Sequence, residues 1–498
     1  MLLTAIIFLP LVGGLIIALF LKEERQIRVA ALLVTFLELV LSVLAFAAFK
    51  QVNVVGDMAL ELSKSWIPYF DINYHIGIDG LSTPLIILSS ILGMCAVLTS
   101  WSVKLRVKEY FAWLLILQTA VVGVFVSLDL VMFFIFWELE LIPMYFLISI
   151  WGTGRKEYSA MKFLIFTLLG SAFMLIGILA IYFSVGTFNV VELQGTLSSA
   201  NLILPAGLLF WFILIAFAVK LPVWPVHSWL PDAHTDAPTA VSVMLAGVLL
   251  KMGGYGMIRL AIGMFPNEAK EYAWIMATIA AISVLYGAVI TLRQTDLKRL
   301  IAFSSISHMG YVLLGISSIA GVNGTISHVG LTGAAMQMFT HGTITGLLFL
   351  VVGYIYEKTH TRYIPDLGGL AANMPLVACI FVIAGLASLG LPSTSGFVGE
   401  LLVFLGTYDV WIIPTALSVF GIVITSGYIL WTIQRVMFGP RRDRFIGIGD
   451  AGIIEAAPMV ILVITIFVVG IYPSILTDVF DSGIRPMIQM FGGSANLP

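Results

Sequence analysis

Residues 220–238 read KLPVWPVHSWLPDAHTDAP; they follow a long apolar run and precede a second one that reaches Lys251. Proline has no backbone N–H and clashes with the preceding turn, so Pro222 and Pro225 predict a break or kink just after Lys220. Inside a lipid bilayer, a broken helix is tolerated only where protein or internal water satisfies the freed backbone groups. A lysine at such a break therefore indicates a hydrated polar site within the membrane.

The amino-acid composition is that of a polytopic membrane protein. Of the 498 residues, 60% are hydrophobic and 10% are charged, whereas a soluble globular chain has about 25% charged residues. The formal net charge of −2 gives no indication of nucleic-acid binding. Residues 1–21 are not expected to be a cleaved signal, because they lack a basic N-terminal segment. The charged run 22–25 follows them directly, as it would follow a membrane anchor.

Residues that hold metals and redox cofactors are sparse. Cys95 and Cys379 lie singly in apolar runs, and an iron–sulfur cluster needs about four cysteines. No GxGxxG segment follows a strand, which argues against a dinucleotide-binding fold. The histidines, cysteines and aspartates have no metal-ligand spacing. We therefore expect this chain to bind no cofactor and no metal.

Hydropathy divides the chain into membrane-spanning helices. A spanning helix needs about 20 apolar residues, and on that criterion we expect an all-α membrane fold with about fourteen spans. Residues 50–80 are expected to form a longer outer loop. The expected spans are 2–21, 28–49, 81–101, 110–127, 130–150, 160–185, 205–228 (broken), 238–262, 272–292, 297–317, 326–356, 374–408 (broken), 411–436 and 455–477.

Basic residues in the loops predict the orientation. The loops after the first, third, fifth, ninth, eleventh and thirteenth spans hold eighteen lysines and arginines, and the opposite loops hold three. Cytoplasmic loops are enriched in lysine and arginine, so both termini are expected on the outer side. The three cations of the outer loops are Lys50, Lys64 and Lys270.

A second break predicts an internal repeat. Residues 389–396 read LGLPSTSG and interrupt the twelfth span, as Pro222 interrupts the seventh. The breaks are five spans apart, so two consecutive five-helix units, the second inverted, would each have a broken fourth helix. Inverted repeats with broken helices are typical of secondary transporters. The expected units are 1–109 (spans 1–3 and the outer loop), 110–262 (first repeat), 272–436 (inverted second repeat) and 437–498 (span 14 and a tail).

Six ionisable side chains within the expected spans are candidates for a functional site. Each costs about 2.5–3.5 kcal/mol to insert, so a functional role is the default interpretation. A static ion pair that fixes helix register explains an isolated pair equally well. A series over spans 5, 7, 8 and 12, with two breaks, favours function. The six are Glu38, Glu138, Glu140, Lys220, Lys251 and Glu400.

Helix geometry restricts which of these groups can pair. Glu138 and Glu140 point about 200° apart on one helix, so they are not expected to face the same lysine. Lys220 ends a half-helix, where the carbonyl end of the helix dipole favours a cation. Lys251 is followed closely by two glycines, which permit close helix packing.

Four histidines are candidates for the same site. His308 and His341 lie mid-helix among small hydroxyl residues able to hold water, and histidine can accept and release protons at physiological pH. These two stand between Lys251 and Glu400 in the order of the sequence, which favours a proton relay, although a lone buried histidine is more often a satisfied core residue. The other two, near the hinge and explained equally by loop structure, are His227 and His234.

Four stretches together resemble a known family. They are WELELIPMYFLI at 137–148, the break at 220–238, residues 304–310 and the segment 368–400. Over essentially its whole length the chain is similar to the antiporter-like membrane subunits of respiratory complex I, and among them to the M type. In that family a glutamate in helix 5, lysines in helices 7 and 8 and an ionisable residue in helix 12 carry protons. The matching positions here are Glu138, Lys220, Lys251 and Glu400.

Some features place the chain within this family, and others depart from it. Subunits of the L and N types usually carry lysine in helix 12, where this chain has Glu400. The long lateral helix of the L type is not expected in this chain. Glu140 stands where the family often has an uncharged residue, and Glu38 matches no family role.

The resemblance implies a proton-translocating module of an NADH–quinone oxidoreductase. Glu138 would keep Lys220 protonated, and separating the pair would send the proton through Lys251 towards Glu400. The chain would be a subunit of that enzyme without redox chemistry of its own, since flavin, iron–sulfur clusters and quinone are expected in partner subunits. Its expected neighbours are L- and N-type subunits, lipid and, indirectly, the peripheral redox arm, with no nucleic acid.

Two alternatives remain open. One is the D-type subunit of a multisubunit Na⁺/H⁺ antiporter, or the related subunit of a membrane-bound hydrogenase, whose sequences are similar. The other is a structural spacer that only holds the membrane arm together. The expected location is a bacterial plasma membrane, with a thylakoid or a mitochondrial inner membrane as alternatives.

Overall fold

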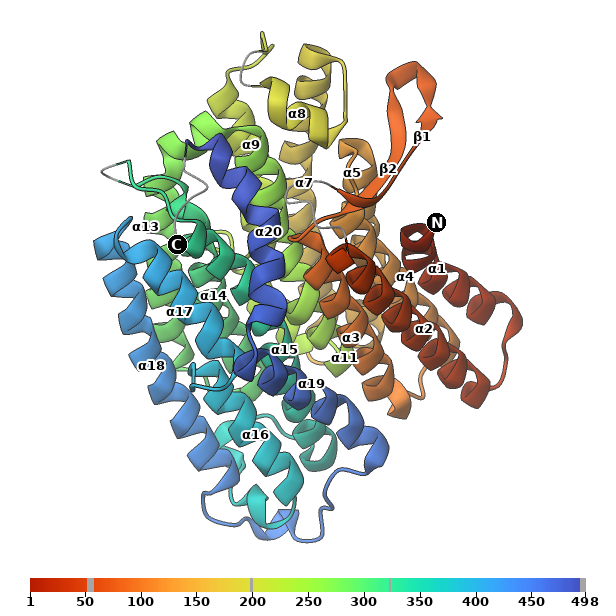
Figure 1. The fold of residues 1–498 in the computed structure, drawn as a ribbon. Helices are drawn as coiled ribbons and strands as arrows, with labels where there is room; N and C mark the ends of the chain where they lie inside the picture. Colours follow the sequence, from red (N-terminus) through yellow and green to blue (C-terminus); the bar gives the residue numbers. More distant parts are fainter. Residues whose placement is uncertain (52–57, 198–199, 322–323, 493–498) are drawn as a thin grey trace.

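Long helices make up most of the chain in the computed structural model (Figure 1). Within the described residues, twelve helices are long and apolar enough to cross a membrane. Two broken helices bring the number of spans to fourteen, so the expected count and the all-α membrane fold are confirmed. The structure describes residues 1–51, 58–197, 200–321 and 324–492; residues 52–57 of the expected outer loop and 493–498 of the expected tail lie outside the described residues.

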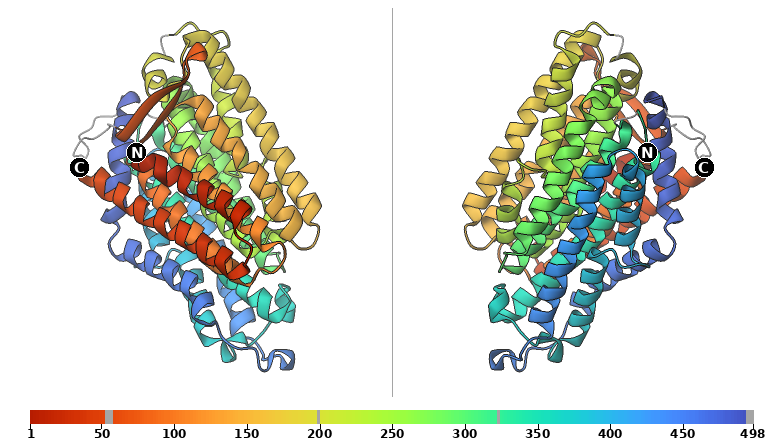
Figure 2. Two further views of the ribbon diagram at one scale, coloured as in Figure 1. Left: turned by 90° about the vertical axis from the view of Figure 1, so that its right-hand side faces the viewer. Right: turned by 90° about the vertical axis from the view of Figure 1, so that its left-hand side faces the viewer.

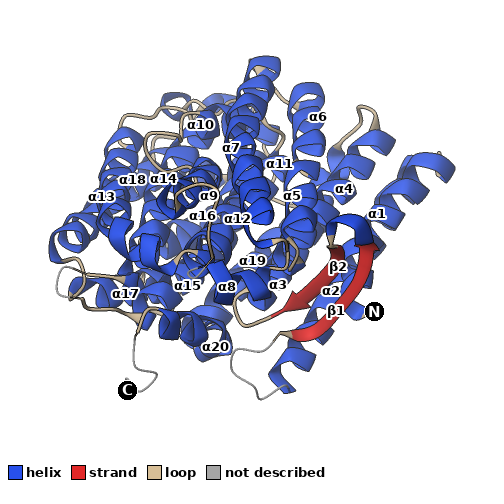
Figure 3. Cartoon of the chain, turned by 90° about the horizontal axis from the view of Figure 1, so that it is seen from above, coloured by secondary structure: helices blue, strands red, loops and turns tan. Residues whose placement is uncertain are grey.

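The N-terminal part contains three spans and a hairpin. The spans are α1 (Leu2–Phe20), α2 (Glu24–Gln51) and α3 (Ser82–Thr99). The expected outer loop contains two antiparallel strands, β1 (Ala59–Ile67) and β2 (Ile72–Ile78). In β2 the larger apolar residues recur at every second position, which is the period of a strand with one buried face. Figure 3 shows the hairpin at the edge of the helix bundle.

The next five spans correspond to the first predicted repeat. Residues 229–236, expected to be loop, form a short helix instead, and two stretches of the eighth span are π-helical. Short π-helical segments inside α-helices, called π-bulges, are frequent at functional sites. The elements are α4 (Val107–Val126), α5 (Leu130–Leu139), α6 (Leu141–Trp151), α7 (Lys156–Val185), α8 (Val190–Thr196), α9 (Ala206–Lys220), α10 (Trp229–Asp236), α11 (Thr239–Met244), η4 (Leu245–Leu249), α12 (Leu250–Gly256) and η5 (Met257–Ile262).

The remaining helices form the second predicted repeat and the C-terminal part. The twelfth span is broken, because α16 ends at Ser388 and α17 begins at Ser395. The break therefore lies where the proline–glycine segment predicted it. The elements are α13 (Pro266–Thr291), α14 (Leu297–Ile316), α15 (His328–Thr359), α16 (Pro375–Ser388), α17 (Ser395–Tyr408), α18 (Ile412–Met437), α19 (Ile453–Ile471) and α20 (Ser474–Met490).

One backbone contact occurs in both predicted repeats. At the start of α5, Leu130 N donates to Phe188 O at 2.9 Å, and at the start of α14, Leu297 N donates to Arg362 O at 3.0 Å. An aspartate caps each of these two helices, Asp129 for α5 and Asp296 for α14. These matching contacts support the predicted division into two five-helix units, which stays a prediction.

The residues after the last predicted span form a helix rather than a tail. Figure 2 shows α20 on the side of the bundle that also holds the N-terminus and the hairpin. Gly80, just before α3, packs against its backbone so closely that a Cβ there would overlap Val479 O. The unit expected at 437–498 thus contains a further helix after its predicted span. The buried face of α20 consists of Leu476, Val479, Phe480, Gly483, Ile484, Met487 and Ile488.

Candidate functional site

The first break is stabilised inside the protein. α9 ends at Lys220, and the chain resumes a helix only at Trp229. The Trp229 indole donates to Val219 O at 3.0 Å, so it satisfies a carbonyl that the break has freed. The chain thus meets the condition under which a broken helix is stable at membrane depth.

Lys220 lies in a pocket formed by an acid and two aromatic rings. Its side chain is 1% exposed and forms an ion pair with Glu140, which is fully buried. Its Nζ also lies 5.1 Å from the ring centroid of Trp137 and 5.6 Å from that of Phe163. A carboxylate and two ring faces compensate for the water that an ammonium group loses on burial.

The structure corrects the predicted partner of Lys220. We expected Glu138, but the ion pair is made by Glu140. Trp137 and Glu140 are three residues apart, so they share the helix face that meets Lys220. Glu138 is half-buried and forms no ion pair with Lys220, but it stays within electrostatic range of that lysine.

This arrangement predicts different effects for the two acids. Glu140→Gln is expected to destabilise the protein by about 3–5 kcal/mol, because it leaves the buried Lys220 cation unpaired. Glu138→Gln, at a half-buried position, is the matched control and is expected to cost less than about 1 kcal/mol. Thermal melting of the purified parent complex measures both. Equal destabilisation by the two variants would contradict the assignment of the pair.

Lys251 lies between the two π-helical stretches of the eighth span and is fully buried. Its Nζ donates to Ala246 O, a carbonyl within η4. The same Nζ lies 2.7 Å from His341 Nδ1 on α15. The π-helical segment η4 thus provides a backbone acceptor for the lysine. The imidazole of His341 is a group that can exchange a proton with the lysine.

A chain of buried groups continues from Lys251 to Glu400. The rings of His341 and His308 have their centroids 5.6 Å apart, and His308 Nδ1 lies 3.5 Å from Glu400 Oε1. Between these three side chains is a small cavity of about 10 Å³, lined also by Thr340 and Ser388. That volume is on the order of one water molecule. The two histidines, predicted as a pair, therefore do lie between Lys251 and Glu400.

Glu400 lies beside the second break. It is 5% exposed and belongs to the second turn of α17. Gly390, within the break, has a φ of +72°, and a Cβ there would lie 2.5 Å from Glu400 Oε2. Only glycine suits this position, because it tolerates positive φ and leaves room for the carboxyl group. Each break thus has an ionisable side chain of the site next to it.

Lys220 and Lys251 belong to helices that are in close contact. A Cβ on Gly253 would lie 2.6 Å from Leu221 N and 2.8 Å from Phe217 O, both backbone atoms at the end of α9. The helix that carries Lys251 therefore packs directly against the break that carries Lys220. This contact connects the Lys220–Glu140 ion pair to the series of buried groups that runs from Lys251 to Glu400.

Widening this contact is expected to weaken proton transfer. Gly253→Ala would force α12 away from α9 and lengthen the path between the two lysines. Proton transfer needs the groups within hydrogen-bond reach or one water apart, so we expect the contribution of this subunit to the proton yield per electron to fall at least about threefold. Gly427→Ala on α18 is the control, because nothing lies within 4 Å of its Cβ position. Proton uptake by vesicles during NADH oxidation measures both. An unchanged yield in Gly253→Ala would contradict the importance of this contact.

The other two predicted histidines lie outside the chain of contacts. His227 is 6% exposed and packs edge-on against Tyr286, with ring centroids 4.8 Å apart. His234 is fully buried and stacks on Phe349 at 4.6 Å. Neither ring nitrogen of His234 has a hydrogen-bond partner among the described residues. Their relay role stays a prediction that these contacts do not favour.

Glu38 is separate from the site. It is fully buried in α2, and one carboxyl oxygen accepts a hydrogen bond from Gln118 Nε2 at 3.0 Å. In the part of the chain that the structure describes, no hydrogen bond or ion pair joins it to Lys220 or Lys251. It therefore provides a buried carboxyl group with which the acids of the site can be compared.

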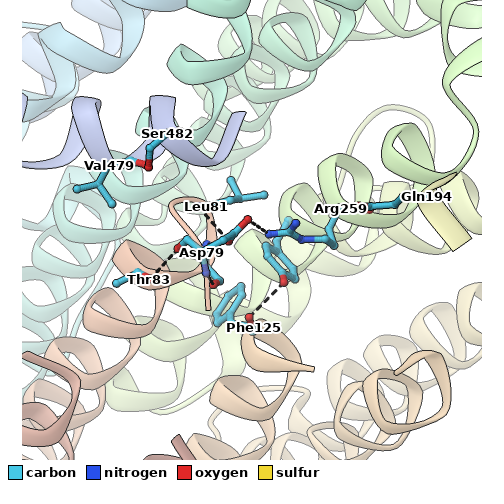
Figure 4. A network of polar contacts seen from close by, with 10 residues as sticks. Asp79, Leu81, Thr83, Phe125, Gln194, Arg259, Val479 and Ser482 are labelled. Atoms are coloured by element: carbon cyan, nitrogen blue, oxygen red, sulfur yellow. Dashed lines mark hydrogen bonds and ion pairs between the residues drawn. The ribbon is translucent and has the colours of Figure 1, made fainter. Parts of the chain in front are cut away.

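Two further cations, which were not among the predicted site residues, are buried. Arg259, in η5, is 4% exposed and forms an ion pair with Asp79, which is 5% exposed (Figure 4). Lys298, in the first turn of α14, is 3% exposed and donates to Ala237 O at 2.6 Å. Lys298 is one of the eighteen cations assigned to loops, and Arg259 belongs to no predicted group. Hydropathy averages hide a single cation near the end of an apolar run.

Among the described residues, no group of three or more histidines, cysteines, aspartates or glutamates could hold a metal ion. The site is instead a series of buried acidic and basic side chains at two helix breaks inside a polytopic membrane protein. The ion pair of Lys220 and Glu140 lies at one end of this series, and the carboxyl group of Glu400 lies at the other. This combination defines the class of antiporter-like proton or ion translocators.

Comparison with known proteins identifies the family. The family model described as "NADH:quinone oxidoreductase/Mrp antiporter, TM" matches residues 127–425. NADH-quinone oxidoreductase subunit M of Rhodobacter capsulatus is 39% identical over 98% of this chain and 97% of its own length. NAD(P)H-quinone oxidoreductase chain 4 of Gloeobacter violaceus is 38% identical over 96% of this chain and 91% of its own length. A chain of respiratory complex I from Thermus thermophilus matches with a TM-score of 0.88 and 27% identity, over 99% of this chain and all of that chain.

The chain belongs to the NADH:quinone oxidoreductase/Mrp antiporter transmembrane family. These matches confirm the family that the sequence motifs indicated. They also confirm the similarity of this chain to M-type subunits.

Proposed function

We propose that this chain is the M-type, proton-translocating membrane subunit of an NADH–quinone oxidoreductase. Its relatives of that name align with it from end to end. The observation that carries the proposal is the buried series Lys251, His341, His308 and Glu400, in which neighbouring groups are in contact or about one water apart. Amines, imidazoles and carboxyls in such contact can pass a proton from one to the next.

The ion pair between Lys220 and Glu140 is the proposed switch at the start of the series. For a pair about 4 Å apart at an effective dielectric of about 20, the attraction is about 4 kcal/mol. The closed pair keeps the proton on Lys220. When the pair opens, the ammonium loses its partner while it stays desolvated, so the proton moves towards Lys251. Glu138, within electrostatic range of Lys220, is the proposed second acid of the switch.

The free energy of this ion pair is large enough to move one proton across the membrane potential. Moving one charge across about 100 mV costs about 2.3 kcal/mol, which is less than the attraction lost when the pair opens. One opening and closing of the pair is therefore sufficient to drive one proton. We place the hinge movements at the two breaks, after Lys220 and around Gly390, where the backbone is already free of regular helix bonds.

The trigger is proposed to come from a neighbouring subunit. Iron–sulfur clusters are assigned to partner subunits, because this chain has only two cysteines in 498 residues and such a cluster needs about four. Flavin and quinone are assigned to partner subunits on the family resemblance. The proposed neighbours in the membrane are L- and N-type subunits, with lipid around them. The proposed membrane is a bacterial plasma membrane, with both termini on the outer side as the loop charges predict.

The nearest rival is a subunit of a multisubunit Na⁺/H⁺ antiporter, since the matching family includes such proteins. Purification in mild detergent decides between the two. Recovery of the chain with peripheral flavin and iron–sulfur proteins supports an NADH–quinone oxidoreductase. Recovery with small antiporter subunits, and without redox proteins, would overturn the proposal.

The rival of another class is a structural spacer. In a spacer, neutralising Lys220, Lys251 or Glu400 would reduce assembly of the complex, but the assembled fraction would keep its proton yield per electron. In a proton-translocating subunit the assembled fraction loses yield. The ratio of proton uptake to NADH oxidised, measured on assembled complex, separates the two.

A further inference from the structure

A buried ion pair lies at one end of the eighth span, apart from the series that ends at Glu400. We propose that Arg259 and Asp79 form an electrostatic seal that stops protons from returning to Lys251 from the hairpin side of the bundle, the side that the loop charges predict to be outer. The inference rests on the proposed function, since a seal matters only in a chain that moves protons. We call these two residues the outer seal.

Arg259 stands in line with the proton-carrying lysine. Lys251, Tyr255 and Arg259 follow one another at intervals of four residues, so they lie along one face of the eighth span. Eight residues of α-helix correspond to about 12 Å, which is an upper bound here because Arg259 lies in the π-helical η5. Tyr255 fills the middle: its hydroxyl donates to Phe125 O at 3.1 Å, and the guanidinium of Arg259 lies 5.7 Å from its ring centroid. The row leads directly from Lys251 to the end of the span.

The geometry around Asp79 leaves this point with a net positive field. One carboxylate oxygen of Asp79 accepts from Leu81 N at 3.1 Å and Ser82 N at 3.0 Å, and the other faces Arg259 (Figure 4). These backbone donors belong to the start of α3, whose dipole contributes about half a positive charge there. A guanidinium stays charged in proteins. The negative charge of Asp79 is thus shared between a full cation and the helix end.

Other elements cover the outer seal. On one side, α20 lies against it: a Cβ on Gly483 would be 2.5 Å from Leu81 N. Figure 4 shows Val479 and Ser482 of α20 beside the turn that carries Asp79. On the other side, Gln194 of α8 donates to Arg259 O at 3.1 Å. Burial by these two helices gives the charges a low-dielectric surrounding, in which a fixed cation acts most strongly on a passing proton.

A fixed arginine in a narrow, dry passage is a known means of excluding protons and cations from a pore. The competing explanation is that Asp79 only caps α3 and that Arg259 only fastens the eighth span to it. The two explanations can be separated because removing either residue breaks the same ion pair. Removing Arg259 leaves a negative site that attracts protons, whereas removing Asp79 leaves a positive one that repels them.

The test compares Arg259→Gln with Asp79→Asn in the complete parent complex, reconstituted in liposomes. A potassium diffusion potential drives protons inward without NADH, and an internal pH dye reports their passive entry. We expect Arg259→Gln to raise entry about tenfold or more, the effect of one charge at about 10 Å with an effective dielectric of about 20. Asp79→Asn and Arg259→Lys, which keep the positive charge, are expected to match the unmodified complex.

Equal entry in Arg259→Gln and the unmodified complex would overturn the seal, and so would equal increases in Arg259→Gln and Asp79→Asn. If Arg259→Gln does not assemble, Arg259→His replaces it, because its charge can be removed by raising the pH. The seal predicts that entry in Arg259→His rises with pH, and a flat profile would overturn it. A Lys220→Met complex that pumps normally would refute the proposed function instead, and it leaves this passive measurement unchanged.

Discussion

Lys251→Met is expected to lower proton flux through this subunit by about a hundredfold while the complex still assembles. Methionine keeps the length and most of the volume of the side chain but cannot hold a proton. A proton crossing that point without a base meets a barrier of roughly 2.5–3.5 kcal/mol, the cost of an unassisted charge in a span, and each 1.36 kcal/mol is about a factor of ten in rate. Vesicles that oxidise NADH, with proton uptake and NADH consumption recorded together, give the yield per electron.

Lys358→Met is the control for this variant. Lys358 lies at the end of α15 and pairs with Glu455, and both side chains are about one-third exposed. This variant removes a lysine that, in the described part of the chain, makes no contact with the buried series of Lys251, His341, His308 and Glu400. A normal proton yield in Lys251→Met, in complex assembled to the normal level, would remove this residue from the pathway.

The second large effect is expected when both members of the switch are neutralised. Glu140→Gln alone leaves a buried cation without a partner, whereas Glu140→Gln combined with Lys220→Met leaves no charge. Replacing a whole buried ion pair by uncharged residues is often neutral or stabilising. We therefore expect the double variant to regain most of the roughly 3–5 kcal/mol that the single variant loses, yet to have no proton yield from this subunit.

Thermal melting and proton uptake on the same preparations test this prediction. The unmodified complex, Glu140→Gln and the double variant form the series. Recovery of stability together with loss of proton yield is the expected result. If the double variant also recovered proton yield, the pair would be a device that fixes helix register and not a switch.

Much of the fold follows from local sequence. Pro222 removes a backbone donor wherever it stands, so the break after Lys220 could be predicted without knowledge of the neighbours. The same holds for the glycine–proline segment around Gly390. Long apolar runs are equally local, and the fourteen spans were therefore predicted correctly.

The partners of the buried charges depend on distant parts of the chain. The choice between Glu138 and Glu140 depends on how α5 and α6 are rotated against α9, and that rotation is set by packing. One local signal was available, because Trp137 and Glu140 share a helix face and an aromatic ring beside a buried ammonium is favourable.

Arg259 illustrates the same limit more strongly. Its partner Asp79 lies 180 positions earlier in the sequence, and neither residue stands in a recognisable motif. The hairpin and α20 were also missed as elements, since their alternating or amphipathic patterns are weaker than those of the spans around them.

The central claim is that protons leave Lys251 through His341 and His308 and reach Glu400. The most direct measurement is the proton yield per electron of the Glu400→Gln complex, beside Glu38→Gln, which changes a buried carboxyl group outside the series. The account predicts that Glu400→Gln removes the contribution of this subunit and that Glu38→Gln keeps it. An unchanged yield in assembled Glu400→Gln complex, or an equal loss in both variants, would contradict it.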